Sequence, residues 1–290
     1  MILTLYSGEN EFDQCVAALR AQDYPHWQHK VISNLPNKQA HRACYSEIMA
    51  RREYDLFIKL DADMVFADEG ALGRIVRFLQ ARPNLDHALF AVHDFMSDSL
   101  LLGLHVFSRR AKWAIHADDL FVDPAPDIPG ERQVIWDAPA PLVRHSPDPS
   151  PYHAFRFGVH RAFKAFQPDR LVLDVPQSKA QWCLLTKVWD HFERTRDRRL
   201  GLAVLGADLA WRGKLDPARQ EYAGSEVQAE FAKHADQSAS DLHRILSPRW
   251  APGPVRRWNR IKVIGPRLML SVVINGITGL LMKMARLLRA

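Results

Sequence analysis

The sequence predicts an α/β fold, in which a mainly parallel sheet carries helices on both faces and a helical region follows. Three observations lead to this class. Short apolar runs alternate with amphipathic stretches of roughly a dozen residues in the first third of the chain. Apolar residues in those stretches recur at helical spacing. With 290 residues and 47% hydrophobic content, the chain can bury a large core.

The opening of the chain predicts a strand followed by a helix. Residues 2–6 are a short apolar run. Residues 11–22 carry apolar side chains at positions i, i+3, i+4 and i+7, namely Phe12, Cys15, Val16 and Leu19. One side of this helix is therefore expected to face the core.

The same alternation continues to residue 107. Asn37 can cap a helix that continues to about residue 52. A further helix is predicted over residues 69–81, and strands over residues 30–33, 55–60, 87–92 and 104–107. Because strand–helix–strand units connect parallel strands by crossovers, the sheet is expected to be mainly parallel.

The segments after residue 107 are less regular. SRRAKWAIH is predicted to be helical. Prolines recur throughout residues 118–151, which predicts an ordered loop lying across the sheet rather than a regular element. From residue 155 to about residue 245 the pattern is helical again.

Residues 155–166 combine an apolar face with a basic stripe formed by Arg156, His160 and Lys164. The stripe either lies in water or faces an anionic ligand, and the pattern favours the first reading.

Composition and charge limit the classes of function. The three cysteines are scattered and odd in number, which argues against a disulfide framework and a cysteine-based zinc site and suits a reducing compartment. We expect no secretory signal at the N-terminus, since no basic segment and no long apolar segment stand there. Ten bases and no acids follow Asp241, so the overall charge of +6 leaves the first 241 residues at −4.

The stretch FIKLDADMVF places two carboxylates, Asp61 and Asp63, at the carboxyl end of the third predicted strand. Ligands of parallel α/β sheets bind beyond that edge. Residues i and i+2 of an extended segment point to the same side, so the two carboxylates would repel unless they shared a cation. Mg²⁺ or Mn²⁺ would fit, together with phosphate oxygens of a substrate. Alternatively, Asp61 pairs with Lys59 or an arginine and Asp63 caps the next turn.

The order of these elements resembles the nucleotide-binding half of a GT-A glycosyltransferase, in particular the family-2-like group. LTLYSGENEFDQCVAALRAQDY is similar to the first strand and helix of that family, and NKQAHRACYSEIMARREYDLFIKLDAD to the helix and strand before its metal motif. The resemblance covers about residues 1–165. It implies a Rossmann-like GT-A fold, a nucleotide-sugar donor, and an Asp-x-Asp motif that holds Mn²⁺ or Mg²⁺ and the donor diphosphate.

The resemblance also implies a set of donor-binding residues: Tyr6, Ser7, Glu9, Ser33, Asn34, Arg42 and Asp61. Two motifs depart from the family pattern. The usual Asp-Asp-Gly-Ser is replaced by ISNLP, and the usual Asn-Glu is replaced by Ser7-Gly8-Glu9. Glu9 can equally be a charge in the first turn of a helix, and Arg42 can equally be solvated or ion-paired.

Transfer of a sugar requires a base that deprotonates the acceptor hydroxyl. By resemblance we assign this role to Asp118 or Asp119, with Asp127 and Glu131 in reserve, although adjacent acids also cap helices. His145 is the expected third metal ligand beside Asp61 and Asp63, with His153 a weaker candidate. A histidine in such a proline-rich segment can also be a hydrogen-bonded loop residue.

The C-terminal tail combines basic residues with the uncharged run 268–282. As a helix this run would extend about 22 Å, short of a hydrocarbon core of about 30 Å. It suits a segment lying in the headgroup region at the cytoplasmic face of the inner membrane. Alternatively, it packs within the protein or against a second copy. Nucleic-acid binding is not expected, because the body is acidic and the tail is apolar.

The sequence thus predicts a metal-dependent glycosyltransferase, inverting by family resemblance, that moves a sugar to a glycan or lipid-linked acceptor in envelope or surface polysaccharide synthesis. Residues 1–167 would form the catalytic region, 168–247 a helical extension and 248–290 the membrane-associating tail. Two alternatives remain: a non-catalytic, membrane-associated scaffold, and another metal-dependent nucleotide transferase. The second lacks support, because YSGENEF has no lysine or arginine for phosphates.

Overall fold

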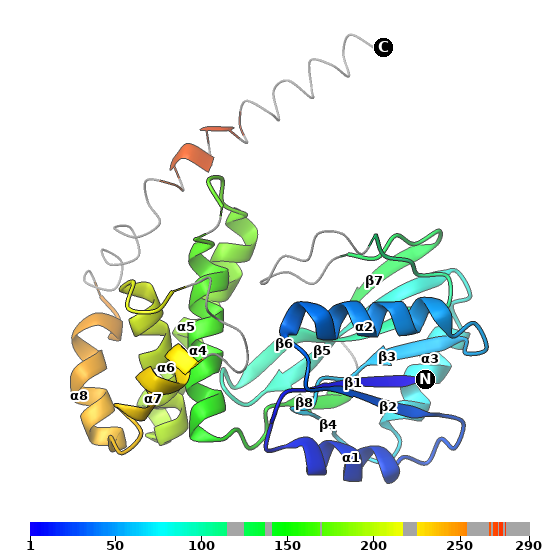
Figure 1. The fold of residues 1–290 in the computed structure, drawn as a ribbon, viewed down its shortest axis with the longest axis horizontal. Helices are drawn as coiled ribbons and strands as arrows, with labels where there is room; N and C mark the ends of the chain where they lie inside the picture. The colour runs from blue at the N-terminus through cyan, green and yellow to red at the C-terminus, as the bar shows by residue number, and fades with distance from the viewer. Residues whose placement is uncertain are drawn as a thin grey trace. The chain divides into compact units, whose positions relative to one another are not determined.

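A computed structural model describes residues 1–114, 125–136, 141–168, 170–216 and 225–253, with Arg267, Met269, Leu270, Ser271, Val273, Ile274 and Gly276 near the C-terminus. The chain divides into two compact units, one formed by Met1–His153 and the other beginning at Ala154. Figure 1 shows the strands in the first unit and helices α4 to α8 in the second. The functions predicted for residues 1–167, 168–247 and 248–290 stay predictions.

The first unit is built on a mixed sheet, in which eight strands are found among the described residues. Their order is β2-β1-β3-β6-β5-β8-β4, and β7 pairs with β5. β1 runs parallel to β2 and β3, and β5 runs parallel to β7 and β8, whereas β6 is antiparallel to β3 and β5. The bounds are β1 Ile2–Tyr6, β2 His29–Ser33, β3 Leu56–Lys59, β4 Met64–Phe66, β5 Leu85–Asp94, β6 Ser99–Ser108, β7 Glu131–Ile135 and β8 Val143–His145.

Helices cover both faces of this sheet, α1 (Phe12–Arg20) and α3 (Ala71–Gln80) on one and α2 (Asn37–Ala50) on the other. Neighbouring residues of a strand divide between the two cores, as alternation across a strand requires. Ile58, for example, belongs to the core that includes residues of α1 and α3, while Phe57 belongs to the core that includes residues of α2. The predicted α/β class, with helices on both faces and a helical C-terminal region, is confirmed.

Three local predictions are wrong. Pro36, not Asn37, occupies the N-cap of α2. The described part of SRRAKWAIH is a turn and an isolated bridge between Lys112 and Asp127, not a helix. The proline-rich stretch contains β7 and β8, because its proline-free windows are long enough for short strands.

The second unit is helical, as the sequence predicts. Its helices are α4 Pro151–Phe166, α5 Val175–Thr195, α6 Arg198–Trp211, α7 Ser225–Ala232 and α8 Ala239–Trp250. Two glycines let α4 approach α6 closely. A Cβ on Gly158 would lie 1.7 Å from the carbonyl oxygen of Ala203, and a Cβ on Gly206 would lie 2.2 Å from that of Phe155.

The described C-terminal positions contact the connection between α4 and α5. Arg267 donates to the carbonyl oxygens of Phe166, Gln167 and Arg170. Ser271 is fully buried, and its Oγ accepts from the backbone N–H of Leu173 at 2.7 Å. Met269 and Val273 are exposed. None of the helices within the described residues is long and apolar enough to cross a membrane.

Candidate metal and donor-binding site

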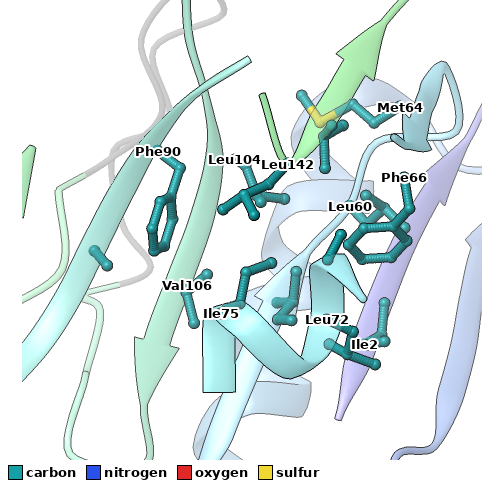
Figure 2. Packing of buried hydrophobic residues seen from close by; sticks show 14 of the residues in the cluster. Ile2, Leu60, Met64, Phe66, Leu72, Ile75, Phe90, Leu104, Val106 and Leu142 are labelled. Carbon is teal, nitrogen blue, oxygen red and sulfur yellow. The ribbon is translucent and has the colours of Figure 1, made fainter. Parts of the chain in front are cut away.

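Asp61 and Asp63 lie on a short turn between β3 and β4, at the carboxyl edge of the sheet. The backbone N–H of Ala62 donates to the carbonyl oxygen of Leu5, which fixes the turn beside the end of β1. Leu60 and Met64 flank the turn and are buried in the core, as Figure 2 shows. The apolar run around the two acids thus anchors the turn, and the carboxylates are left at its rim.

The two carboxylates have different partners. Met64 N–H donates to the carbonyl of Asp61, so the segment is a turn and not the extended pair that the sequence suggests. Asp61 faces the buried Lys59, whose Nζ lies 3.2 Å from Oδ1 and 3.4 Å from Oδ2. These distances exceed the 2.7–2.9 Å of a tight charge-assisted hydrogen bond. Lys59 therefore offsets the charge of Asp61 without a short bond.

Asp63 lies beside His145, which comes from β8. His145 Nε2 is 3.3 Å from Asp63 Oδ2, and Ser146 Oγ donates to the same oxygen at 2.7 Å. The Ser146 N–H also donates to the carbonyl of Asp63 at 2.7 Å. On its other side, His145 Nδ1 lies 2.8 Å from Asp94 Oδ1, within hydrogen-bond distance. Two predicted ligands, Asp63 and His145, are therefore adjacent.

A divalent cation fits the Asp63–His145 pair better than the complete predicted set. Two ligands bound at right angles to one ion at about 2.1 Å are about 3 Å apart, close to the separation of Oδ2 and Nε2 here. Asp61 is turned toward Lys59. In the part of the chain that the structure describes, no three His, Cys, Asp or Glu side chains are grouped closely enough to hold a metal ion. Donor phosphate oxygens and water would have to complete the coordination.

Of the predicted donor residues, Tyr6, Ser33 and Asn34 lie at the same edge, whereas Arg42 lies on α2. Tyr6 pairs with Ser33 in the β1–β2 ladder and stacks on Phe12 with ring centroids 4.4 Å apart. Asn34 follows with a positive φ of 59° and an exposed side chain. Arg42 lies exposed on α2. Tyr6, Ser33 and Asn34 thus form a polar rim at the strand ends beside the Asp61–Asp63 turn.

Glu9 has a local role in the loop after β1. Both Ser7 groups donate to its carboxylate, the backbone N–H at 2.6 Å and the hydroxyl to the other oxygen. Burial raises the pKa of Glu9, while the hydrogen bonds from Ser7 lower it. The pair fixes the loop, and its contact with a nucleotide stays a prediction.

Two buried groups beneath the acidic turn respond to its charge. Glu11 is 1% exposed, and burial with the nearby charge of Asp63 raises its pKa to about 7. Its Oε1 has no hydrogen-bond partner among the described residues. Burial, with the charges of Asp63 and Asp61, raises the pKa of the Cys15 thiol to about 12, so Cys15 stays protonated. The negative charge of the acidic turn thus adds to the effect of burial on both groups.

Several predicted residues are not placed at this edge. Asp118 and Asp119 lie outside the described residues. Glu131 pairs with Leu85 at the opposite end of β5 from Asp94, roughly 30 Å away along an extended strand, and Asp127 precedes it. His153 bonds to Ser150 at the start of α4.

A cavity of about 570 Å³ lies at the opposite ends of the strands from the acidic turn, and its lining includes Ile2, Leu56 and Arg109. It does not include the acidic turn. We place the site at the acidic turn, because the acids, the histidine and the polar rim converge there.

Sequence reasoning missed Asp94, Ser97 and Glu11. Asp94 is fully buried at the carboxyl end of β5. The predicted strand stopped at residue 92, two positions before it. The rule that singled out Asp61, an acid where an apolar strand ends, would have found Asp94 had that strand been extended. For Glu11 the signal was weaker, because it looked like an ordinary acid at a helix start.

No family model matches the chain, and no curated protein matches it. The solved structures that are similar to it include a mannosyltransferase and TarS. The mannosyltransferase PcManGT from Pyrobaculum calidifontis, in complex with GDP-Man and Mn²⁺, aligns at 16% identity and a TM-score of 0.36, over 94% of this chain and 86% of that one. TarS from S. aureus aligns at 13% identity and a TM-score of 0.32, over 86% of this chain and 55% of TarS. At these TM-scores the function has to be argued from the chain's own residues.

Proposed function

We propose that this chain is a metal-dependent glycosyltransferase that moves a sugar from a nucleotide-sugar donor to a glycan or lipid-linked acceptor. One observation carries the proposal. Asp63, from an Asp-x-Asp turn at the carboxyl edge of an α/β sheet, lies 3.3 Å from His145, which the chain brings from β8. A carboxylate and an imidazole at this spacing, on a rim of polar side chains, suit a divalent cation and a diphosphate.

The residues have separate roles in this proposal. Asp63 and His145 would hold Mn²⁺ or Mg²⁺, and Asp61 would bind the donor beside it once its long contact with Lys59 opens. The metal supplies neutralisation of the charge that develops on the departing nucleoside diphosphate. Tyr6, Ser33 and Asn34 would hold the nucleoside, and Asp118 or Asp119 would accept the proton of the acceptor hydroxyl. In-line attack by that hydroxyl would invert the anomeric carbon.

A non-catalytic role is the second candidate, and one observation favours it. Lys59 is buried beside Asp61, so part of the acidic turn is already neutralised without any metal. A scaffold that keeps the fold but binds no donor would need such internal compensation. The Lys59–Asp61 contacts favour the enzyme instead, since they are longer than a tight charge-assisted hydrogen bond and Asp61 is only partly buried.

We also propose that the C-terminal tail holds the protein at the cytoplasmic surface of a membrane, where envelope or surface polysaccharides are assembled. Ten bases follow Asp241 without an acid. Met269 is 73% exposed and Val273 is 57% exposed, and Leu171 is 73% exposed. Apolar side chains among basic residues suit the headgroup region of an anionic leaflet.

A thermal-shift panel tests the catalytic proposal. UDP-, GDP-, CMP- and dTDP-linked sugars are each added with and without Mn²⁺. We expect one nucleotide class to raise the melting temperature only with metal, because a ligand of the native state stabilises it. No response to any donor, with or without Mn²⁺, would favour the scaffold.

Two matched variants locate the effect. Asp63→Ala should abolish the metal-dependent shift, because it removes a charged ligand. Asp13→Ala, an exposed acid on α1, should leave it unchanged. Unchanged sugar transfer by Asp63→Ala would refute the assignment of Asp63.

A further inference from the structure

Asp94 is a fully buried carboxylate whose two oxygens have different partners. Oδ2 accepts from the backbone N–H of Ser97 at 2.8 Å and from the Ser97 hydroxyl at 2.5 Å. Oδ1 lies 2.8 Å from His145 Nδ1. The turn after β5 therefore uses one oxygen of Asp94, and the other faces the imidazole.

The backbone fixes where this imidazole lies. β8 sits between β5 and β4, so that His145 pairs with Asp94 on one side and with Met64 on the other. The carbonyl of His145 also accepts from the backbone N–H of Phe95. With only 8% of the residue exposed, the ring has little room to turn over. Its Nδ1 edge faces Asp94, and its Nε2 edge faces Asp63.

We propose that Asp94 is a positioning residue that fixes the tautomer of His145. The carboxylates of Asp94 and Asp63 can both only accept, but Asp94 is closer to the ring, 2.8 Å from Nδ1 against 3.3 Å between Asp63 and Nε2. The neutral ring therefore carries its proton on Nδ1 and leaves the lone pair of Nε2 directed to the side of Asp63. A histidine binds a metal through an unprotonated nitrogen, and a carboxylate on the other nitrogen is the usual way to hold that state. The metal-binding consequence rests on the proposed function, whereas the tautomer does not.

The geometry makes Asp94→Asn an informative substitution. Ser97 keeps its two donors, so the amide oxygen of an asparagine would take the place of Oδ2. The amide NH₂ would then face His145 and donate to Nδ1. This reverses the tautomer and puts the proton on Nε2, with no change in side-chain shape.

The tautomer can be read in metal-free protein by ¹⁵N NMR of the histidine rings, with His145 identified by the signal that His145→Gln removes. We expect the wild-type neutral ring to be protonated on Nδ1 and the ring in Asp94→Asn on Nε2. A wild-type ring protonated on Nε2 would overturn the proposal, even if the variant failed to fold. Asp98→Asn makes the same chemical change in the same turn, at a φ of 46° that asparagine tolerates, and should leave the tautomer unchanged.

Mn²⁺ binding, followed by electron paramagnetic resonance without donor, tests the consequence. Asp94→Asn should weaken Mn²⁺ affinity about 10- to 100-fold, as loss of an outer partner of a histidine ligand does elsewhere, and Asp98→Asn should not. Equal affinity in wild type and Asp94→Asn, with an unchanged tautomer, would refute the role of Asp94 and leave the glycosyltransferase proposal intact. A wild-type protein with the expected tautomer but no Mn²⁺ binding would instead refute the proposed metal site.

Discussion

At the scale of single residues, each carboxylate of the acidic edge has its own set of partners. Asp61 faces a lysine, Asp63 a histidine and a serine, and Glu9 a serine. Glu11 alone among these acids combines nearly complete burial with an oxygen that has no partner in the described chain. Its carboxyl group is therefore the one most sensitive to the charge of its neighbours.

Glu11 should make the fold less stable as pH rises. Its pKa is raised to about 7 in the folded protein from an ordinary 4.5, so the folded state keeps the proton that the unfolded state releases. Stability from this group is complete below about pH 4.5 and is lost as pH rises toward 7. Glu11→Gln should remove that loss, which amounts to roughly 3 kcal/mol.

Denaturant unfolding of both proteins at pH 5 and pH 8 measures this effect. The difference between variant and wild type should favour the variant at pH 8 more than at pH 5, and titration of other groups cancels in that comparison. A difference that does not change with pH would show that Glu11 is ionised in the folded state.

The candidate site residues that could be predicted from the sequence are those marked by their immediate neighbours in the chain. Asp61 and Asp63 were visible as acids in an apolar strand, and His145 only through family resemblance. Asp94 was not found, because the predicted strand stopped at residue 92 and because its contact with His145 depends on the insertion of β8 between β5 and β4. Strand neighbours that are distant in sequence leave no mark on the local pattern.

At the scale of elements, periodicity predicted most strands and helices but not their partners. The alternation of Phe57 and Ile58 and the apolar face of α1 follow from local sequence. The antiparallel β6 and the strands within the proline-rich segment do not, since pairing is decided by contacts across the sheet. The contact between α4 and α6 was also missed, because Gly158 and Gly206 resemble weak points in helices until the partner backbone is known.

Gly158→Ala should strongly destabilise the second unit. Alanine favours a helix by about 1 kcal/mol over glycine, but its Cβ would lie 1.7 Å from the carbonyl oxygen of Ala203. The helices would have to separate, at a cost of about 3 kcal/mol or more, which exceeds the gain in propensity.

Thermal unfolding followed by circular dichroism tests this, with Gly276→Ala as the matched control. Gly276 is a helical position where an added Cβ meets nothing within 4 Å. The control should leave the melting temperature unchanged or slightly higher. Equal melting temperatures for Gly158→Ala and wild type would mean that the close approach of α4 and α6 is absent in solution.

At the scale of the whole molecule, the net charge differs in sign between the tail and the rest of the chain. The first 241 residues carry −4 and the remainder carries ten bases. The tail nevertheless contributes to the fold, since Arg267 and Ser271 bond to the connection between α4 and α5. Composition predicted the difference in charge between the tail and the rest of the chain. The contacts of the tail with the connection between α4 and α5 could be seen only in the structure.

The two roles of the tail should be separable by substitution. Met269→Glu with Val273→Glu should remove binding to vesicles that contain anionic lipid, because both side chains are exposed, and should leave the melting temperature unchanged. Ser271→Ala should instead lower the melting temperature. It leaves the Leu173 N–H without its acceptor and should cost about 1–3 kcal/mol, with vesicle binding retained.

Vesicle co-sedimentation and thermal unfolding of both variants give the result. Truncation after Gly253 should show both losses together. Undiminished vesicle binding by the truncated protein would rule out the tail as the membrane contact.

The pairing of β4 with β8 is short, with three residue pairs: Met64–His145, Val65–Arg144 and Phe66–Val143. It joins segments that stand far apart, Ser146 being 83 positions from Asp63. A ladder with so few bonds across so long a loop should open before the rest of the sheet, and its amide protons should exchange with solvent sooner than those of β1. Any ligand that bridges Asp63 and His145 would hold this ladder closed, so slowed deuterium uptake there would report occupancy even when no sugar is transferred.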